Sequence, residues 1–431
     1  MRYLALAISF TGLTGLGALG ACGGPPRPAA PRAATVTPAR DLAGARSAVP
    51  PTSGRDRVAG LQVRDPRVVD LDIIRITAHA RGPGSEPELT SVASADLFKQ
   101  ANEAARTGRP QEAIATYRQL VADFPESQFA PVALFNTAAL YDAQADLPAT
   151  LTALTELVAR YPAARESIDG HLYIAALQAD HQQWAEAAAT LDAVLARTNL
   201  TFADRVEAFA RKGYVELEQH RFDAAEASLS AALDEWRKAP RIDDPYYIAM
   251  AHYYRGELMH LRFADAPVRS GDDEMVADLE AKRALAVQAY DRWRESLRYK
   301  QAYWATAAGY QMSQIFVELW EAHVKAPYPR RIAVATRPTY VADVHTRVRQ
   351  DLEKALEGHR MNVELAKAYG VETAWSRSSE RQAATIMELL AKDIAGSYIT
   401  PASPSSESPP GSRLQRAGPN AGAPKAGSGE N

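Results

Sequence analysis

The sequence predicts an all-α protein, an α-solenoid of stacked helical hairpins between two segments with no fold of their own. Apolar and small residues recur at a period of about 34 residues between Ser94 and Lys300, which is typical of helical repeats. The hydrophobic share of 46% suffices for a core, yet no aromatic residue lies between Phe10 and Phe98. The last stretch, 397–431, is rich in Ser, Pro and Gly and is expected to be a disordered tail.

Composition and charge exclude several classes of protein. The chain has 431 residues, with 49 Lys and Arg against 52 Asp and Glu, and a formal net charge of -3. A general nucleic-acid binder would carry a basic surplus to contact phosphates, so no nucleic-acid partner is expected. The single cysteine, Cys22, excludes a disulfide framework and any metal site built from several thiolates.

Residues 1–21 have the features of a secretory signal peptide. Arg2 supplies a positive start, an apolar run dotted with glycines extends from Leu4 to Ala21, and small residues precede Cys22. The run is marginal for a membrane span, which needs about 20 apolar residues. We therefore expect this segment to direct the chain out of the cytoplasm and to be removed.

The tetrad Leu19-Gly20-Ala21-Cys22 resembles the lipobox of bacterial lipoproteins. The resemblance implies cleavage before Cys22, a diacylglycerol on its sulfur and an acyl chain such as palmitate on the new amino group. Gly23 stands where inner-membrane retention would favour Asp, so the analogy implies a lipid anchor in the outer membrane, on the periplasmic face. The alternative is an ordinary signal peptide in which Cys22 is incidental.

Residues 22–66, rich in Pro, Ala and Arg, are expected to form a lipidated tether. They cannot bury enough apolar surface to offset their ordering entropy, and their proline clusters favour extended polyproline II. At about 3.1 Å per residue, some 35 residues reach roughly 100 Å. The arginines could touch anionic lipid or peptidoglycan, or simply keep a spacer soluble. Residues 67–93 form a partly ordered lead-in, where Val68–Ala80 could be a short strand, with no second strand evident nearby.

Residues 94–300 hold the repeats. Small residues at fixed positions let the two helices of a hairpin touch, large residues fill the remaining space, and a proline ends the second helix. Weaker units lie around Ala175, Gly213 and Gly256, and residues 301–396 form a helical extension with degenerate repeats. The two clearest units contain Leu97, Ala101, Ala113, Tyr117 and Pro125, and then Leu134, Ala138, Tyr141, Leu154 and Pro162, with Thr150 in place of an alanine.

This spacing resembles the tetratricopeptide repeat (TPR). The tails of the first two units, Asp123–Ser127 (DFPES) and Arg160–Ala164 (RYPAA), are similar to those of TPR lipoproteins of the bacterial envelope, including the lipoprotein of the outer-membrane β-barrel assembly machinery. The order of lipobox, tether and repeats also resembles TPR lipoproteins of gliding-motility machinery, by layout alone.

No motif in the mature chain predicts catalysis, a cofactor or a small-molecule substrate. His252 and His260 could share a helix face with Glu257, but solvated or capping histidines explain this spacing better than a metal site. The aromatic residues from Tyr290 to Trp320 fit core packing, or else an anchor patch for a partner. The sequence thus favours a protein that is not an enzyme and needs no cofactor or metal.

The favoured function is an outer-membrane TPR scaffold that binds a protein partner in an envelope machine for assembly or motility. In TPR folds the first helix of each hairpin lines a concave groove, which suits an extended or helical peptide. Packing between repeats is an equal alternative for the two phenylalanines of this set. The resemblance places the groove at Phe98, Asn102, Phe135, Asp142, Tyr214, Glu218, Tyr253 and Glu257.

Two other functional classes stay open. The chain could be a non-catalytic activator or regulator of a peptidoglycan-modifying enzyme, since activators need no chemistry of their own. It could also be a pilotin-like assembly factor for pili or secretion. The identity of the partner does not follow from the sequence.

Overall fold

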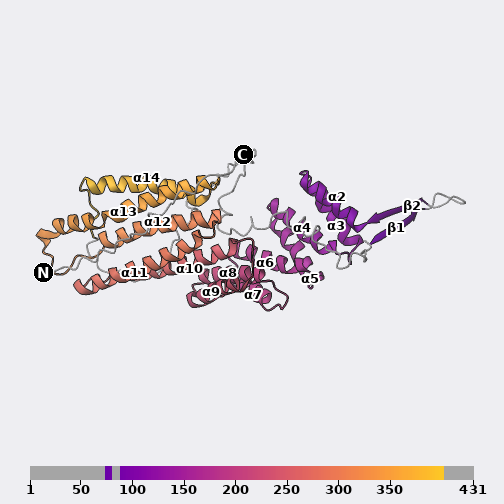
Figure 1. Cartoon of the computed structure of the whole chain (residues 1–431), viewed down its shortest axis with the longest axis horizontal. Coiled ribbons are helices and arrows are strands. Elements are labelled where there is room, and N and C mark those ends of the chain that lie inside the picture. Colours follow the sequence, from indigo (N-terminus) through magenta and orange to yellow (C-terminus); the bar gives the residue numbers. More distant parts are fainter. Residues whose placement is uncertain (1–72, 80–87, 402–431) are drawn as a thin grey trace, which may run out of the picture. The chain divides into compact units, whose positions relative to one another are not determined.

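The computed structural model describes residues 73–79 and 88–401. The predicted signal peptide, Cys22, the tether of residues 22–66 and residues 402–431 of the predicted tail (397–431) lie outside the described residues. The prediction of disorder is wrong for the start of that tail, where Tyr398 packs on the His345 ring and the Ile399 carbonyl lies 2.9 Å from His345 Nε2. Within the described part, the expectation of an α-solenoid of TPR type is confirmed, with two short strands before the first helix (Figure 1).

Thirteen α-helices and one short 3-10 helix follow one another in the described part of the chain. They are α2 (Ser94–Arg106), α3 (Pro110–Asp123), α4 (Phe129–Ala143), α5 (Leu147–Arg160), α6 (Arg165–Asp180), α7 (Trp184–Leu195), α8 (Phe202–Glu218), α9 (Phe222–Lys238), α10 (Tyr246–Asp265), α11 (Asp272–Leu297), α12 (Ala302–Val324), η2 (Val334–Thr336), α13 (Arg337–Ala368) and α14 (Ala374–Ile394).

The helices form consecutive hairpins. We call α2, α4, α6, α8, α10 and α12 the A helices, and α3, α5, α7, α9, α11 and α13 the B helices. Each A helix packs against its own B helix and against the next A helix, as stacked repeats require. Residues 301–396 continue this pattern with α12 and α13, and the last described helix, α14, packs on both.

Local signals set the helix boundaries. Pro125 and Pro162 each lie two residues beyond the last residue of a B helix, as expected for residues that cannot continue a helix. Pro110 occupies the first turn of α3, where its missing N–H costs nothing. Thr201 and Asp204 form a capping box at the start of α8, which satisfies two backbone N–H groups.

The turn between the A and B helices of the first four hairpins contains one residue in the left-handed region. These residues are Gly108, Ala145, Gln182 and His220, with φ of 75°, 61°, 60° and 58°. Along the chain, successive members of this set are 37, 37 and 38 residues apart. The expected period of about 34 residues is therefore too short for this chain, whose helices and loops are slightly longer.

Small residues at the crossing of the A and B helices give the repeats their close packing. Ala101, Ala138 and Ala175 are at most 1% exposed. The equivalent positions in the next two hairpins are Gly213 and Gly256, where an added Cβ would collide with Leu229 and with the Trp293 indole. These contacts explain why the large residues of the B helices can be fully buried.

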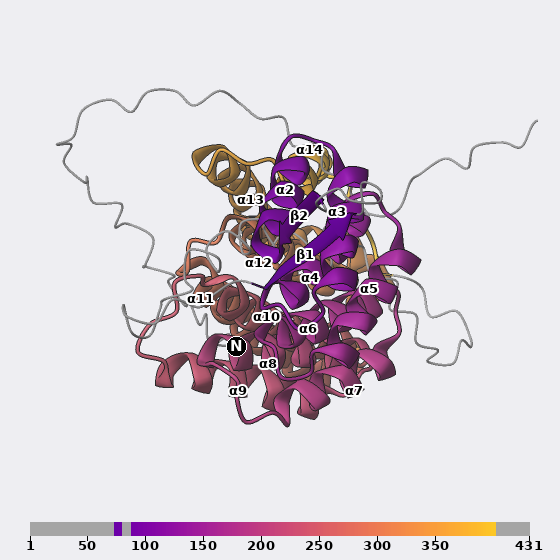
Figure 2. The ribbon, with the colours of Figure 1, turned by 90° about the vertical axis from the view of Figure 1, so that its right-hand side faces the viewer.

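The lead-in is a two-stranded antiparallel sheet of β1 (Ile74–His79) and β2 (Glu88–Ala93), with Ile74 paired to Ala93 (Figure 2). The possible strand at Val68–Ala80 is thus present over part of its length. The second strand, which the sequence did not reveal, is β2. Arg75 fixes β1 to the end of α3, because its guanidinium binds the Asp123 carboxylate at 2.5 Å and lies 5.4 Å from the Phe124 ring centroid.

The last helices are joined by close contacts and a buried ion cluster. Gly309 of α12 faces Asn362 of α13, and Asn362 Nδ2 donates to the Thr306 carbonyl at 2.9 Å. At the other end, Asp393 of α14 binds His345 Nδ1 and Arg349 Nε, each at 2.5 Å, with His345 and Asp393 nearly fully buried. These contacts hold α14 against α13.

The fold predicts that Gly256→Ala destabilises the protein. The new methyl group would enter space filled by the fully buried Trp293, and overpacking of this kind costs about 1–3 kcal/mol. Urea unfolding followed by circular dichroism measures the loss. Gly170→Ala in α6 is the matched control, because its Cβ would meet only the movable side chains of Leu157 and Val158 at 3.1–3.2 Å. Equal stability of Gly256→Ala and the wild type would contradict this account of the crossing.

Candidate partner-binding face

The candidate site is the set of side chains that the A helices direct along one face of the stacked hairpins, called here the A-helix row. The eight residues expected in the groove come from four A helices: α2, α4, α8 and α10. Because each A helix packs against the next, with α6 between α4 and α8, these residues belong to one continuous series of helices. They are Phe98, Asn102, Phe135, Asp142, Tyr214, Glu218, Tyr253 and Glu257.

The structure buries three of these eight residues. Phe98 is 2% exposed and stacks on Phe129 with ring centroids 5.0 Å apart. Phe135 is 5% exposed and lies against the Tyr173 ring of α6. Tyr253 is 3% exposed and contacts aromatic rings of α12 and α14. These three side chains pack between repeats and present little surface to a partner in this conformation.

The other five residues are half-buried and mostly polar, and their contacts link neighbouring helices. Tyr173 of α6 donates to Asp142 Oδ2 at 2.7 Å, and Gln311 of α12 donates to Glu257 Oε1 at 2.8 Å. Tyr214 of α8 meets Trp184 edge-on and lies 4.7 Å from the Tyr254 ring centroid. The remaining two residues of this half-buried group are Asn102 and Glu218.

The sequence did not reveal several members of the row, because they hydrogen bond across helices rather than fall at expected groove positions. Asn136 Nδ2 of α4 donates to Tyr117 Oη at 3.2 Å, and that hydroxyl in turn donates to Asn102 Oδ1 at 2.5 Å. This chain of bonds crosses α4, α3 and α2. Burial raises the pKa of Tyr117 to about 12, so its hydroxyl stays protonated and can donate.

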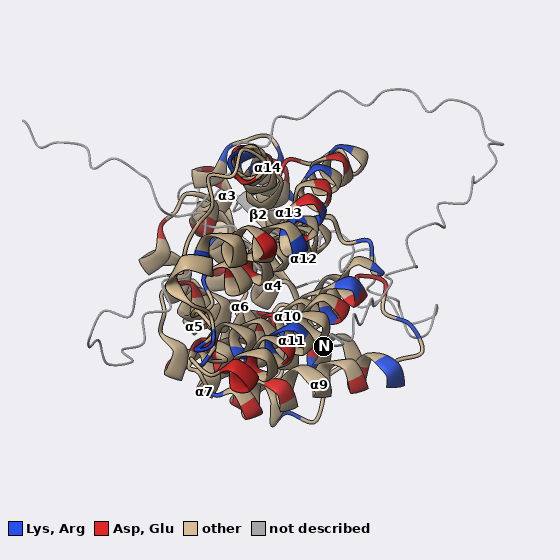
Figure 3. Ribbon diagram, turned by 90° about the vertical axis from the view of Figure 1, so that its left-hand side faces the viewer, with Lys and Arg blue, Asp and Glu red and all other residues tan. Residues whose placement is uncertain are grey.

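The carboxylates of the row come from α4, α8, α10 and α12, at Asp142, Glu218, Glu257 and Glu318. The first and third accept hydrogen bonds from the Tyr173 hydroxyl and the Gln311 amide. Glu318 pairs with His260 at 2.6 Å. Over the end of the molecule turned to the viewer in Figure 3, by contrast, basic and acidic residues are intermixed on the helices.

Histidines of α10 and α13 differ in their surroundings, and none lies in a metal-binding group in the described part of the chain. Burial lowers the pKa of His252 to about 4, with further lowering by nearby arginines, and its ring stacks on Tyr299. Burial also lowers the pKa of His359 to about 4. For His260, burial favours a lower pKa, but the hydrogen bond with Glu318 and the charges of Glu318 and Glu257 together outweigh it and raise the pKa.

The aromatic residues between Tyr290 and Trp320 mainly belong to the core. Trp293, Trp304 and Trp320 are at most 2% exposed, which matches the packing interpretation of this segment. Among the helices that the structure describes, none has both the length and the apolar composition of a membrane span.

Comparisons with known proteins agree on repeat type. The tetratricopeptide-repeat family model matches residues 97–127, which are the first hairpin and the turn after it. No curated protein matches the chain. The chain is similar to a solved tetratricopeptide repeat protein from Parabacteroides merdae, at 12% identity over 70% of this chain and 98% of that one, with a TM-score of 0.33.

Two other solved structures match the chain with similarly low sequence identity and TM-score. One is the C-terminal part of a TPR repeat-containing protein from Cytophaga hutchinsonii, at 12% identity over 70% of this chain and all of that one, with a TM-score of 0.37. The other is MamA from Desulfovibrio magneticus RS-1, at 13% identity over 48% of this chain and 96% of that one, with a TM-score of 0.33. None of these likenesses carries a functional argument.

The low pKa of His359 predicts a loss of stability in mild acid. Its pKa is about 4 in the folded protein and about 6.5 in the unfolded chain, so unfolding takes up a proton between these values. The free energy of unfolding therefore falls as the pH drops below 6.5, by up to about 1.4 kcal/mol per pH unit. Between pH 7 and pH 5 the free energy of unfolding should fall in both proteins. We expect this fall to be about 1–2 kcal/mol smaller in His359→Asn than in the wild type. Urea titrations at both pH values measure this, and identical losses would contradict it.

Proposed function

We propose that this protein is a lipid-anchored scaffold of the outer membrane that holds a protein partner in an envelope machine. The observation that carries the proposal is the A-helix row, in which successive repeats present half-buried polar side chains along one series of helices. TPR folds use such surfaces for protein interaction, and they typically do no catalysis. The lipobox resemblance at Cys22 supports the anchor.

The chemistry of the row favours a partner segment that is extended or helical and carries Lys or Arg. The Asp142 and Glu257 carboxylates accept hydrogen bonds from the Tyr173 hydroxyl and the Gln311 amide. A cationic side chain would form charge-assisted hydrogen bonds to these same oxygens, about twice as strong as neutral ones. The aromatic side chain of Tyr214 adds a half-buried apolar contact beside them.

The anchor would hold the A-helix row near the membrane, and the spacer would let the row reach a partner at some distance from the lipid. One acyl chain binds a bilayer marginally, whereas several hold it almost permanently, since each buried methylene contributes about 0.8 kcal/mol. The Pro-rich segment of residues 22–66 then acts as the spacer between the lipid and the first strand.

Charge reversal in the row tests partner binding. We expect Asp142→Lys with Glu257→Lys to abolish co-purification of the partner from detergent-solubilised envelope, because Lys would repel the cationic segment. The co-purified protein is identified by mass spectrometry from the wild type and quantified with the variant. Glu126→Lys with Glu186→Lys is the matched control, since both glutamates are exposed and lie in a loop and on a B helix. Equal recovery by the row variant and the control would contradict the proposed groove.

The anchor is tested separately at Cys22. We expect the wild type to sediment with the outer membrane and Cys22→Ser to stay in the soluble fraction, because the acceptor sulfur for the diacylglycerol is gone. Mass analysis of the mature amino terminus gives the lipid mass directly. An unmodified terminus in the wild type would refute the anchor while leaving the scaffold proposal intact.

A further inference from the structure

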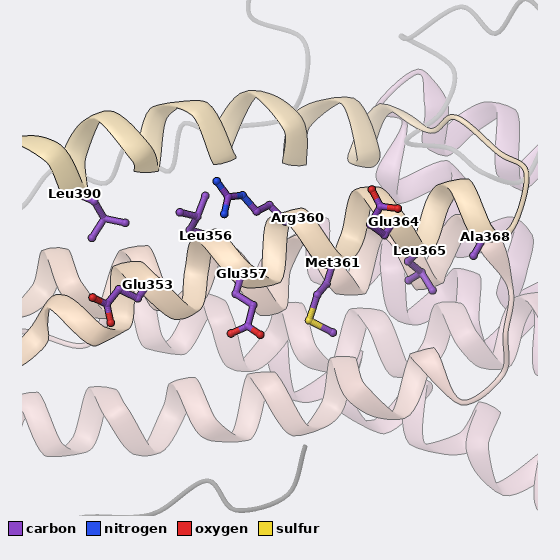
Figure 4. A pocket seen from close by; sticks show the side chains of 9 residues that line it. All are labelled: Glu353, Leu356, Glu357, Arg360, Met361, Glu364, Leu365, Ala368 and Leu390. Atoms are coloured by element: carbon purple, nitrogen blue, oxygen red, sulfur yellow. The ribbon is translucent and has the colours of Figure 1, made fainter. Parts of the chain in front are cut away.

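One face of α13, at its border with α14, has a continuous stripe of residues that line a common hollow. We call Glu353, Leu356, Glu357, Arg360, Met361, Glu364, Leu365 and Ala368 of α13, with Leu390 of α14, the α13 stripe. Its α13 residues recur every three or four positions and therefore share one helix face. They line a hollow of about 530 Å³ (Figure 4).

The floor of the stripe is apolar. Leu356 and Leu390 lie half-buried between α13 and α14, and Met361, which lines the same hollow, is 49% exposed (Figure 4). On α14, Met387 is also 50% exposed. Each buried CH2 of such side chains contributes about 0.8 kcal/mol when a partner covers it. In the described chain Met361 and Met387 are exposed, whereas the two leucines are partly covered by the core between α13 and α14.

The edge of the stripe is acidic. Glu353, Glu357 and Glu364 follow one another along α13, and the last pairs with Lys367 at 2.8 Å. Arg360 lies among them in sequence but points toward α14, where its guanidinium donates to the Met387 sulfur at 3.2 Å (Figure 4). Glu353 lies near Arg349 and helps to raise the pKa of that guanidinium, whose hydrogen bond goes to Asp393.

We propose that the α13 stripe is a second docking site, which takes an amphipathic α-helix of a partner protein whose apolar face is flanked by Lys or Arg. The i, i+3, i+4 spacing of the stripe is the pattern that receives a helix, and residues 353–368 extend over about four turns. The three carboxylates along the edge set the sign of the charges that the helix must carry.

A second copy of this chain fits the stripe less well. If two stripes paired antiparallel about their midpoint, Glu357 of one copy would face Glu364 of the other, twice by symmetry. If they paired in parallel, each glutamate would face its own equivalent. Like charges directly opposed are destabilising, so self-association through this surface is disfavoured. The site lies on a B helix and is independent of the proposed A-helix row.

A binding experiment with defined peptides tests the proposal. Two synthetic helices of about 18 residues, long enough to cover the stripe, share one Leu stripe and differ only in flanking Lys or Glu. Fluorescence anisotropy with the full chain, made as Cys22→Ser to avoid lipid, measures the Kd of each. We expect the Lys peptide to bind and the Glu peptide to bind at least about tenfold more weakly, because the edge of the stripe is acidic.

Variants locate the binding on the chain. The double variant Glu353→Lys with Glu357→Lys should raise the Kd of the Lys peptide by about tenfold or more and lower the Kd of the Glu peptide. Glu126→Lys with Glu186→Lys makes the same charge change elsewhere and should alter neither affinity. Both glutamate pairs are exposed, so folding is expected to be intact, which circular dichroism checks.

Three outcomes would overturn the proposal. The first is no binding of the Lys peptide, and the second is equal loss of binding in the stripe variant and the control. The third is a dimer in analytical ultracentrifugation that Glu353→Lys with Glu357→Lys removes, because a second copy would then occupy the stripe. None of these outcomes bears on the A-helix row.

Discussion

The close crossing of A and B helices at small residues is the constraint on which the rest of the structure depends. At Gly256 the helix backbone of α10 lies directly against the Trp293 indole, and at Gly213 that of α8 lies against Leu229. Such contact leaves no room for a side chain at the crossing and aligns each hairpin on its neighbour. Because every hairpin repeats the same crossing, the A helices come to lie in series, and their outward side chains form one row.

The row and the α13 stripe have different origins in this arrangement. The row arises inside the stack, where polar side chains bridge consecutive A helices and so are half-buried and already bonded. The stripe arises at the last described helices, where α14 is the one described helix that packs on α13 beyond α12. A terminal repeat of a solenoid normally carries a polar outer face for solubility, but here the Met361 and Met387 side chains remain exposed near glutamates. A terminal surface of that composition is suited to binding rather than to capping.

Much of the fold follows from the sequence because the signals are local. Ala101 and Ala113 mark a helix crossing, and Pro125 ends a helix, wherever they occur in such a hairpin. The strand β2 could not be predicted, since the sequence Glu88–Ala93 has no alternation of its own and gains its structure by pairing with β1. The same limit applies to the site. Helical position identifies Asp142 and Glu257, but only tertiary contacts show that Phe98 and Phe135 are turned into the core, and only the end of the stack exposes α13.

Rigid surfaces on a long spacer suit a scaffold for energetic reasons. The stripe is held in place before binding, because α14 is fixed to α13 by the buried contact of Asp393 with His345 and Arg349. The row is likewise fixed by the bonds to Asp142 and Glu257. A preformed surface loses little conformational entropy when a partner binds, so more of the contact energy appears as affinity. The proposed tether adds reach without disturbing either surface, and tethering to the same membrane would raise the local concentration of a partner.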